Sequence, residues 1–294
     1  ILKYDNEYSN LIDYNINKFS IKIDLLKIKD TIKNIMLDNQ QIVNEMIELY
    51  TNATPEEYRS LIEKHYLPSD KERADNAEVP TPVKLVDEML NKIPSRIFES
   101  LNKILEPCCG KGNFVLGIFD MFYNKLIDKY EDTQLLCKDI IEKCLYFGDL
   151  EANNVFFTEQ LLICNAQSYS GIRKTDYKFN SFVGNTLDNE LINMWGIDYF
   201  DAVIGNPPYS TDPSIPNTKP LYDKFIIKYI DNCDYLLFVV PSRWFIGGKG
   251  LDKFRKFMLN RNDIKYIEHE DDATKWFGNS VDIKGGVNFF LKDN

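Results

Sequence analysis

Short apolar runs alternate with amphipathic helical segments along most of this chain, and this alternation limits the possible folds more than any other feature. Strands are predicted at residues 103–105, 144–150, 179–183, 200–204, 235–240, 264–268 and 286–292. Helices are predicted at residues 83–93, 114–129, 155–165, 222–231 and 251–260. Such strand–helix alternation predicts an α/β fold with a mostly parallel, doubly wound sheet.

The apolar run at residues 200–205 ends in the tetrapeptide Asn206-Pro207-Pro208-Tyr209. Open α/β sheets keep their reactive residues at the carboxyl ends of strands, which is where this tetrapeptide falls. Two consecutive prolines fix φ and remove two amide donors, so local N–H groups do not consume the carbonyls of the turn. An asparagine amide beside such a carbonyl forms a pair of acceptors, and the tyrosine supplies a flat face. The turn therefore suits a planar ring with an exocyclic amino group, the alternative being an ordinary proline turn that closes a strand.

A glycine-containing loop follows the first predicted strand. Gly110 and Gly112 allow a tight turn and a close approach to a ligand, and the following helix points its N-terminus into the loop. No Gly-Lys-Ser or Gly-Lys-Thr follows, which argues against a Walker loop, and the missing third glycine argues against the dinucleotide fingerprint. Glu106 ends the preceding strand, where its carboxylate faces either a ligand or solvent.

These motifs, taken in order, resemble those of S-adenosylmethionine-dependent DNA adenine-N6 methyltransferases of the Asn-Pro-Pro-Tyr class, particularly type II restriction–modification methylases. The resemblance covers about residues 79–294. Its segments are 81–89, 104–114, 182–187, 206–209, 221–225, 238–244 and 281–291. It implies the Rossmann-like sheet of class I methyltransferases, with an antiparallel last strand.

The resemblance also implies a binding site for the cofactor S-adenosyl-L-methionine. The cofactor-binding residues carried over from the family are Thr81, Glu106, Pro107, Cys108, Gly110, Gly112, Asn113, Phe114, Asp149, Leu150, Asn185, Thr186 and Asn206. Glu106 would bond the amino group of the methionine part. Asn185 replaces the usual aspartate that reads the cofactor adenine, and an amide can both donate and accept there. The alternative for Asn185 is a capping role in a turn.

The ribose hydroxyls of the cofactor need a carboxylate, and the resemblance assigns this role to Asp149, with Leu150 packing against the adenine. Glu151 is a rival to Asp149. The acid lies about 40 residues after Glu106, about twice the usual spacing of about 20. An insertion around residues 124–138 would explain the difference.

For the acceptor, the resemblance implies that Asn206, Pro207, Pro208 and Tyr209 are catalytic. The Asn206 side-chain oxygen and the Pro207 carbonyl would accept the protons of the amine, and Tyr209 would stack on an adenine flipped out of the duplex. Alignment of the attack supplies most of the remaining catalysis. The predicted function is site-specific adenine-N6 methylation of DNA in a restriction–modification system. The alternatives are methylation of RNA or of a protein glutamine, and a catalytically silent cofactor-binding subunit.

Residues 1–76 differ from the rest and are predicted to be a helical N-terminal region, with the catalytic domain at 77–294. Type II relatives continue into a target-recognition domain where this chain ends, so a recognition domain or a specificity subunit is an expected partner besides double-stranded DNA. The net charge of −10 argues against unaided nucleic-acid binding. A basic cluster either contacts phosphates or forms a solvated helix surface, and its members are Arg243, Lys249, Lys253, Arg255, Lys256, Arg261 and Lys265.

Cysteine and histidine usage argues against a metal site. The chain has six cysteines without a CxxC pair or metal-like spacing, and only two histidines. No apolar stretch reaches the roughly 18 residues of a membrane span, and no signal peptide opens the chain. We therefore expect no membrane association and a cytoplasmic location in a prokaryotic or viral setting.

Overall fold

The computed structural model describes residues 80–172, 176–188, 194–210, 219–248, 250–278 and 283–294. The helices predicted within residues 1–76 lie outside the described residues, and the predicted domain boundary stays a prediction. Most of the polar segment 210–220 and the basic residue Lys249 also lie outside the described residues.

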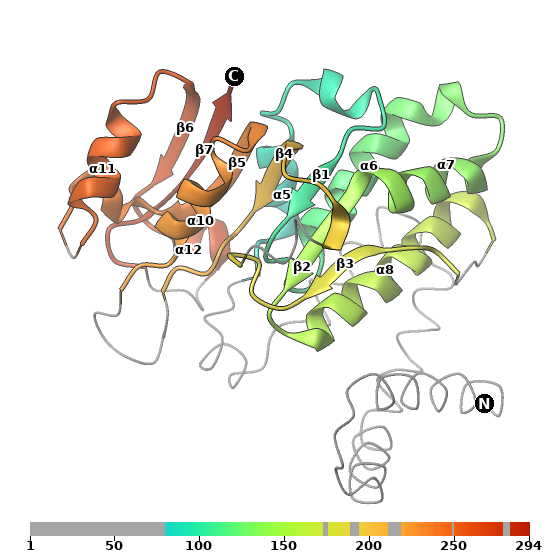
Figure 1. Ribbon diagram of the computed structural model, residues 1–294, viewed down its shortest axis with the longest axis horizontal. Coiled ribbons are helices and arrows are strands. Elements are labelled where there is room, and N and C mark those ends of the chain that lie inside the picture. The colour runs from blue at the N-terminus through green and yellow to red at the C-terminus, as the bar shows by residue number, and fades with distance from the viewer. Residues whose placement is uncertain (1–79, 173–175, 189–193, 211–218, 249, 279–282) are drawn as a thin grey trace, which may run out of the picture. The chain divides into compact units, whose positions relative to one another are not determined.

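One seven-stranded sheet organises the described part of the chain, with the strand order β3-β2-β1-β4-β5-β7-β6 (Figure 1). The strands are β1 (Ile104–Glu106), β2 (Leu145–Asp149), β3 (Asn180–Val183), β4 (Phe200–Gly205), β5 (Cys233–Pro241), β6 (Ile264–Glu270) and β7 (Val287–Asp293). Strands β1 to β5 pair in parallel, and β7 is antiparallel to both β5 and β6. The prediction of a mostly parallel, doubly wound sheet with an antiparallel last strand is confirmed.

The chain reverses its direction of travel across the sheet between β1 and β4. Strands β2 and β3 are added on one side of β1, and β4 then returns to the other side of β1. In open α/β sheets, ligands bind at such a switch point, outside the carboxyl ends of the strands. The topology therefore directs attention to the residues that follow Glu106 and Gly205.

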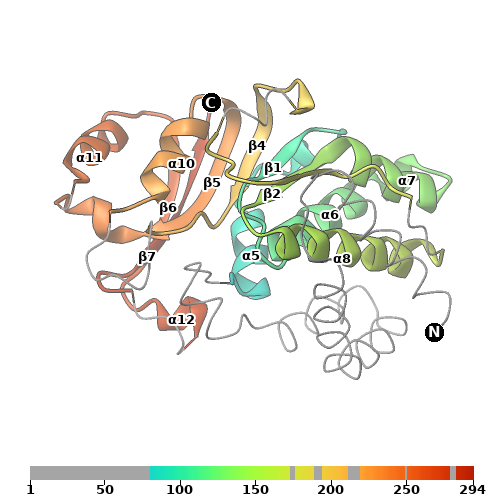
Figure 2. The same ribbon diagram turned by 60° about the horizontal axis from the view of Figure 1, so that its bottom comes forward.

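Helices cover the sheet in two groups. Helices α6, α7 and α8 lie over the half that contains β1, β2 and β3, while α10 and α11 flank the half with β5, β7 and β6 (Figures 1 and 2). The α-helices are α5 (Val83–Leu90), α6 (Asn113–Leu126), α7 (Thr133–Asp139), α8 (Ala152–Ser170), α10 (Tyr222–Tyr229), α11 (Asp252–Leu259) and α12 (Thr274–Phe277). Short 3₁₀ turns occur at η1 (Ser95–Phe98), η2 (Ile127–Lys129) and η4 (Ser242–Phe245), and η3 (Ile140–Cys144) is a π-helical turn.

Helices α8, α7 and the short α12 differ from the sequence prediction, which did not include α12. Helix α8 is longer than the predicted 155–165 and ends where Gly171 adopts φ +71°, a conformation that favours glycine. Helix α7 was not predicted, although Asp132 caps it by accepting hydrogen bonds from the backbone N–H groups of Gln134 and Leu135. This capping aspartate is the sequence signal that would have identified the helix. Together with η2 and η3, α7 occupies the additional chain between α6 and β2.

The burial of each strand follows its position in the sheet. Every residue of β1 is buried, and β4 and β5 are buried at all but one position each. Central strands of a parallel sheet are covered on both faces, which accounts for their continuous apolar sequences. The edge strand β6 instead alternates between half-buried and exposed residues. The rigid centre of the sheet thus supports the strand ends that carry Glu106 and Asn206.

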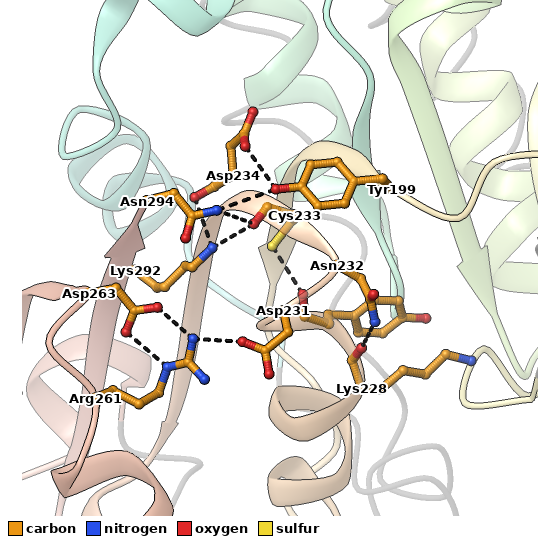
Figure 3. Close-up of polar contacts among 11 residues, drawn as sticks. Tyr199, Lys228, Asp231, Asn232, Cys233, Asp234, Arg261, Asp263, Lys292 and Asn294 are labelled. Carbon is orange, nitrogen blue, oxygen red and sulfur yellow. Dashed lines mark hydrogen bonds and ion pairs between the residues drawn. The ribbon is translucent and has the colours of Figure 1, made fainter.

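A polar network ties the amino-terminal end of β5 to the end of the chain (Figure 3). The buried Lys292 Nζ donates to the carbonyls of Cys233, at 2.6 Å, and Asp234, at 3.3 Å. The Arg261 guanidinium pairs with Asp263 and, at 2.8 Å, with Asp231. Lys292 thus ties β7 to the start of β5, and Arg261 ties the turns before β5 and β6 to each other.

This network changes the interpretation of the basic cluster. Arg261 follows α11, before β6, at the edge of the sheet where β5 begins, whereas Arg243 follows the carboxyl end of β5. The two arginines therefore lie at opposite ends of the sheet and do not form one surface. The guanidinium of Arg261 also holds the pKa of Asp263 below its usual range, as expected for a structural ion pair.

Candidate functional site

An open pocket lies at the carboxyl ends of β1, β2 and β4. With the exception of Gly112, every residue predicted for the cofactor and catalytic sites lines it. The pocket also contains residues that the sequence analysis did not assign, which are Pro80, Cys109, Lys111, Asn154, Gly184, Ser210, Leu221 and Phe225. Gly112 faces away from the pocket, because a Cβ there would lie 3.0 Å from Thr158 Oγ1. Its φ of +85° shows that it shapes the turn.

Glu106 is the most unusual side chain of the pocket. It is 1% exposed, and neither carboxylate oxygen makes a hydrogen bond of normal geometry within the described residues. Burial, followed by the neighbouring Asp149 carboxylate, raises the pKa of Glu106 well above its usual range. The backbone N–H of Cys108 opposes this rise only in part. A buried carboxylate with so little compensation is costly, so a cationic ligand group beside it would relieve that cost.

A glycine makes room for this carboxylate. A Cβ atom at Gly205 would lie 2.6 Å from Glu106 Oε1, so a larger residue at this position would displace the carboxylate. Gly205 ends β4 and directly precedes Asn206. The orphaned carboxylate and the Asn-Pro-Pro-Tyr turn are therefore next to each other across the β1–β4 switch point.

Asp149 joins the glycine loop to the end of β2. Its Oδ2 accepts the backbone N–H of Gly110 at 2.9 Å, and its Oδ1 accepts the backbone N–H of Glu151 at 2.9 Å and Asn154 Nδ2 at 3.2 Å. A carboxylate has about four acceptor positions, and these three bonds leave Asp149 about one. The Glu151 side chain lines the same pocket. Both acids identified in the sequence are thus within the pocket, and Asp149 also has a structural role.

Asn185 and Thr186 are held by local bonds. The Asn185 amide donates to Asp188 Oδ1 and accepts from the Leu187 N–H, both at 3.2 Å, which is the turn geometry considered as the alternative for this residue. Thr186 Oγ1 donates to the Pro107 carbonyl at 2.8 Å and so links the β3 end to the glycine loop. Leu150 lies at the rim with 70% of its surface exposed, where a planar ligand group could cover it.

The Asn-Pro-Pro-Tyr turn is braced from two sides. Asn206 Nδ2 donates to Thr81 Oγ1 at 3.1 Å. The Tyr209 carbonyl accepts the Leu221 N–H at 3.2 Å, and Ser210 pairs with Pro220. The Tyr209 hydroxyl is buried, and burial raises its pKa while the nearby Asn206 lowers it. The ring itself is partly exposed and lines the pocket.

The charge of the pocket is mainly negative. Glu106, Asp149 and Glu151 line it together with one cation, Lys111, whose Nζ donates to Asn154 Oδ1 at 2.9 Å. This arrangement favours a cationic ligand with hydroxyl groups over a polyphosphate. Within the described part of the chain, no group of three or more His, Cys, Asp or Glu side chains could hold a metal ion, and no helix is long and apolar enough to span a membrane.

The strand order and the pocket define the fold of the class I S-adenosylmethionine-dependent methyltransferases. A solved structure described as a putative class I methyltransferase from Listeria monocytogenes superposes with a TM-score of 0.50 and 14% identity, over 83% of this chain and 70% of that one. A DrdV–DNA complex superposes with a TM-score of 0.58 and 18% identity, over 81% of this chain and 29% of that one.

Residues 143–277 match the Eco57I restriction-modification methylase family. An uncharacterized adenine-specific methylase of Mycoplasma pneumoniae is 29% identical over 127 residues, or 41% of this chain and 30% of that protein. The EcoEI methylase subunit, from a type I restriction enzyme of Escherichia coli, is 23% identical over 96% of this chain and 56% of that protein. The chain thus spans about half or less of the length of these curated relatives. The resemblance to adenine-specific methylases is confirmed, and the relatives include a type I subunit besides the type II enzymes named from the sequence.

Proposed function

We propose that this chain is the catalytic part of a site-specific DNA adenine-N6 methyltransferase of a restriction–modification system. The observation that carries the proposal is the adjacency of Glu106 and Asn206. An orphaned buried carboxylate suited to a cationic ligand lies beside a rigid turn suited to a planar amine. A methyltransferase needs both sites in one pocket, because donor and acceptor must meet in line.

The residues of the pocket fit S-adenosyl-L-methionine, which supplies a sulfonium-activated methyl group when bound. Glu106 would accept hydrogen bonds from the ammonium of the methionine part. One ribose hydroxyl would donate to the remaining acceptor position of Asp149, and the other would donate to the Glu151 carboxylate. Leu150 would pack against the adenine ring at the rim.

On the acceptor side, Asn206 Oδ1 and the Pro207 carbonyl would accept the two protons of the adenine N6 amine. These bonds would draw the nitrogen lone pair out of conjugation and direct it toward the methyl group that the cofactor supplies. The amine would lose one proton on methylation, and these acceptors would pass that proton to solvent. Tyr209 would stack on the adenine turned out of the duplex, since a base cannot be methylated in this way within the stack.

Duplex DNA and a recognition element are the partners we infer. The similar proteins include a type I methylase subunit and a protein solved in complex with DNA. With a net charge of −10, the chain itself offers little attraction to phosphates. We infer that a target-recognition domain or a specificity subunit provides most of the DNA affinity and the sequence preference.

Transfer of a labelled methyl group tests the function. The chain, alone and together with a candidate recognition domain or specificity subunit, would be incubated with labelled S-adenosylmethionine and with DNA, RNA or protein. Label in N6-methyladenine from DNA, and none with Asn206→Ala, is the expected result. Label in RNA or in glutamine would identify one of the alternative enzymes. Cofactor binding without transfer to any acceptor would indicate a silent subunit.

A further inference from the structure

Thr81 connects the glycine loop to the Asn-Pro-Pro-Tyr turn through two hydrogen bonds. Asn113 Nδ2, from the first residue of α6, donates to the Thr81 carbonyl at 2.8 Å. Asn206 Nδ2, from the residue after β4, donates to Thr81 Oγ1 at 3.1 Å. Thr81 is 5% exposed, so water competes little for either bond. Three segments that are distant in sequence are thus held together through this one residue.

The second bond matters because a side-chain amide has two ends of similar size and opposite hydrogen-bonding character. Its nitrogen donates two hydrogen bonds, and its oxygen only accepts. Shape alone does not distinguish the two orientations, so the bonding partners decide which end faces a given direction. In the structure Thr81 Oγ1 accepts from Nδ2, so the carbonyl end of the Asn206 amide is turned away from Thr81.

We propose that Thr81 is a positioning residue for methyl transfer and holds the Asn206 amide in place at the end of β4. This inference rests on the proposed function, in which Asn206 must present Oδ1 to an amine. With the amide reversed, its N–H groups would meet the N–H groups of the acceptor, and donor would face donor. Asn113 supports the arrangement by holding the backbone of Thr81. The glycine loop and the acceptor site are thereby coupled through defined atoms.

Two substitutions of Thr81 separate its hydroxyl from its shape. Thr81→Val keeps the branched shape but removes the hydroxyl, and Thr81→Ser keeps the hydroxyl but removes the methyl group. We expect Thr81→Val to lower kcat about 5- to 10-fold, the equivalent of one hydrogen bond of about 1 kcal/mol, and Thr81→Ser to restore most of that loss. The KM for S-adenosylmethionine should change less than about twofold in both. A loss confined to KM, or equal losses in both variants, would overturn the proposal.

Nuclear magnetic resonance tests the same point without any activity. The side-chain amide pair of Asn206 in the ¹⁵N-labelled full chain is identified by its disappearance in Asn206→Asp. Thr81→Val should shift this pair and speed its exchange with water, whereas Thr81→Ser should leave it close to the wild-type position. Unchanged signals in Thr81→Val would refute the bond. If the wild-type protein methylates no DNA, the proposed function fails, while this measurement still decides the role of Thr81.

Discussion

Replacing Glu106 by glutamine tests the central feature of the pocket, a buried carboxylate with no side-chain partner among the described residues. Glutamine keeps the size of the side chain but removes the charge that would meet the cofactor ammonium. A hydrogen bond to a charged group contributes about 1.5–3 kcal/mol, so S-adenosylmethionine should bind about 10- to 100-fold more weakly. Isothermal titration calorimetry measures this directly.

The same substitution should change the dependence of stability on pH. Because burial and Asp149 raise the pKa of Glu106, the native protein keeps a proton that the unfolded chain releases near its ordinary value of 4.5. The free energy of unfolding should therefore fall as pH rises above about 4.5, by at most about 1.4 kcal/mol per pH unit from this group, until the native carboxyl has ionised. In Glu106→Gln this contribution is absent.

Cofactor affinity should show the opposite trend. The ammonium favours the ionised form of Glu106, so binding to the wild-type protein should release a proton and tighten as pH rises through the native pKa. The matched control for the pH dependence of unfolding is Glu151→Gln, which removes the same charge from a partly exposed residue of the same pocket. Our reasoning would be refuted if Glu106→Gln bound the cofactor within about twofold of wild type and unfolded with the same pH dependence.

Three further predictions concern the acceptor turn, the ribose site and the basic residues. Asn206→Ala and Tyr209→Ala should each reduce methyl transfer at least about 100-fold, while the cofactor affinity measured by calorimetry stays nearly unchanged. A loss of cofactor affinity with normal turnover would instead assign this turn to the cofactor site. Asp149→Ala should weaken cofactor binding by about 1–3 kcal/mol, partly because the Gly110 N–H loses its acceptor, and an unchanged Kd would assign the ribose to other acceptors. Arg261→Ala should lower the free energy of unfolding by about 1–3 kcal/mol, measured with urea, and leave DNA affinity unchanged in a mobility-shift titration. Arg243→Ala should weaken DNA binding and reduce its salt dependence. An equal loss of DNA affinity in the Arg243 and Arg261 variants would contradict the placement of these arginines at opposite ends of the sheet.

The local sequence determined the elements of the fold and the position of the reactive turn. Apolar runs such as 200–205 are long enough only for buried strands, and the prolines after Asn206 end the strand whatever surrounds it. Gly110 and Gly112 likewise predict the loop from their backbone freedom alone. These features depend on a few adjacent residues, so they could be inferred without coordinates.

Only the tertiary structure decided which partners those residues have. Glu106 is buried with no side-chain partner among the described residues, Asn185 closes a turn, Thr81 bonds to Asn206, and Arg261 pairs with Asp231 and Asp263. Each of these outcomes, apart from the local turn at Asn185, depends on side chains that are distant in sequence and meet because β4 returns beside β1 or because β7 lies between β5 and β6. Pairing of this kind is set by strand order and register, which the spacing of residues along the chain does not contain.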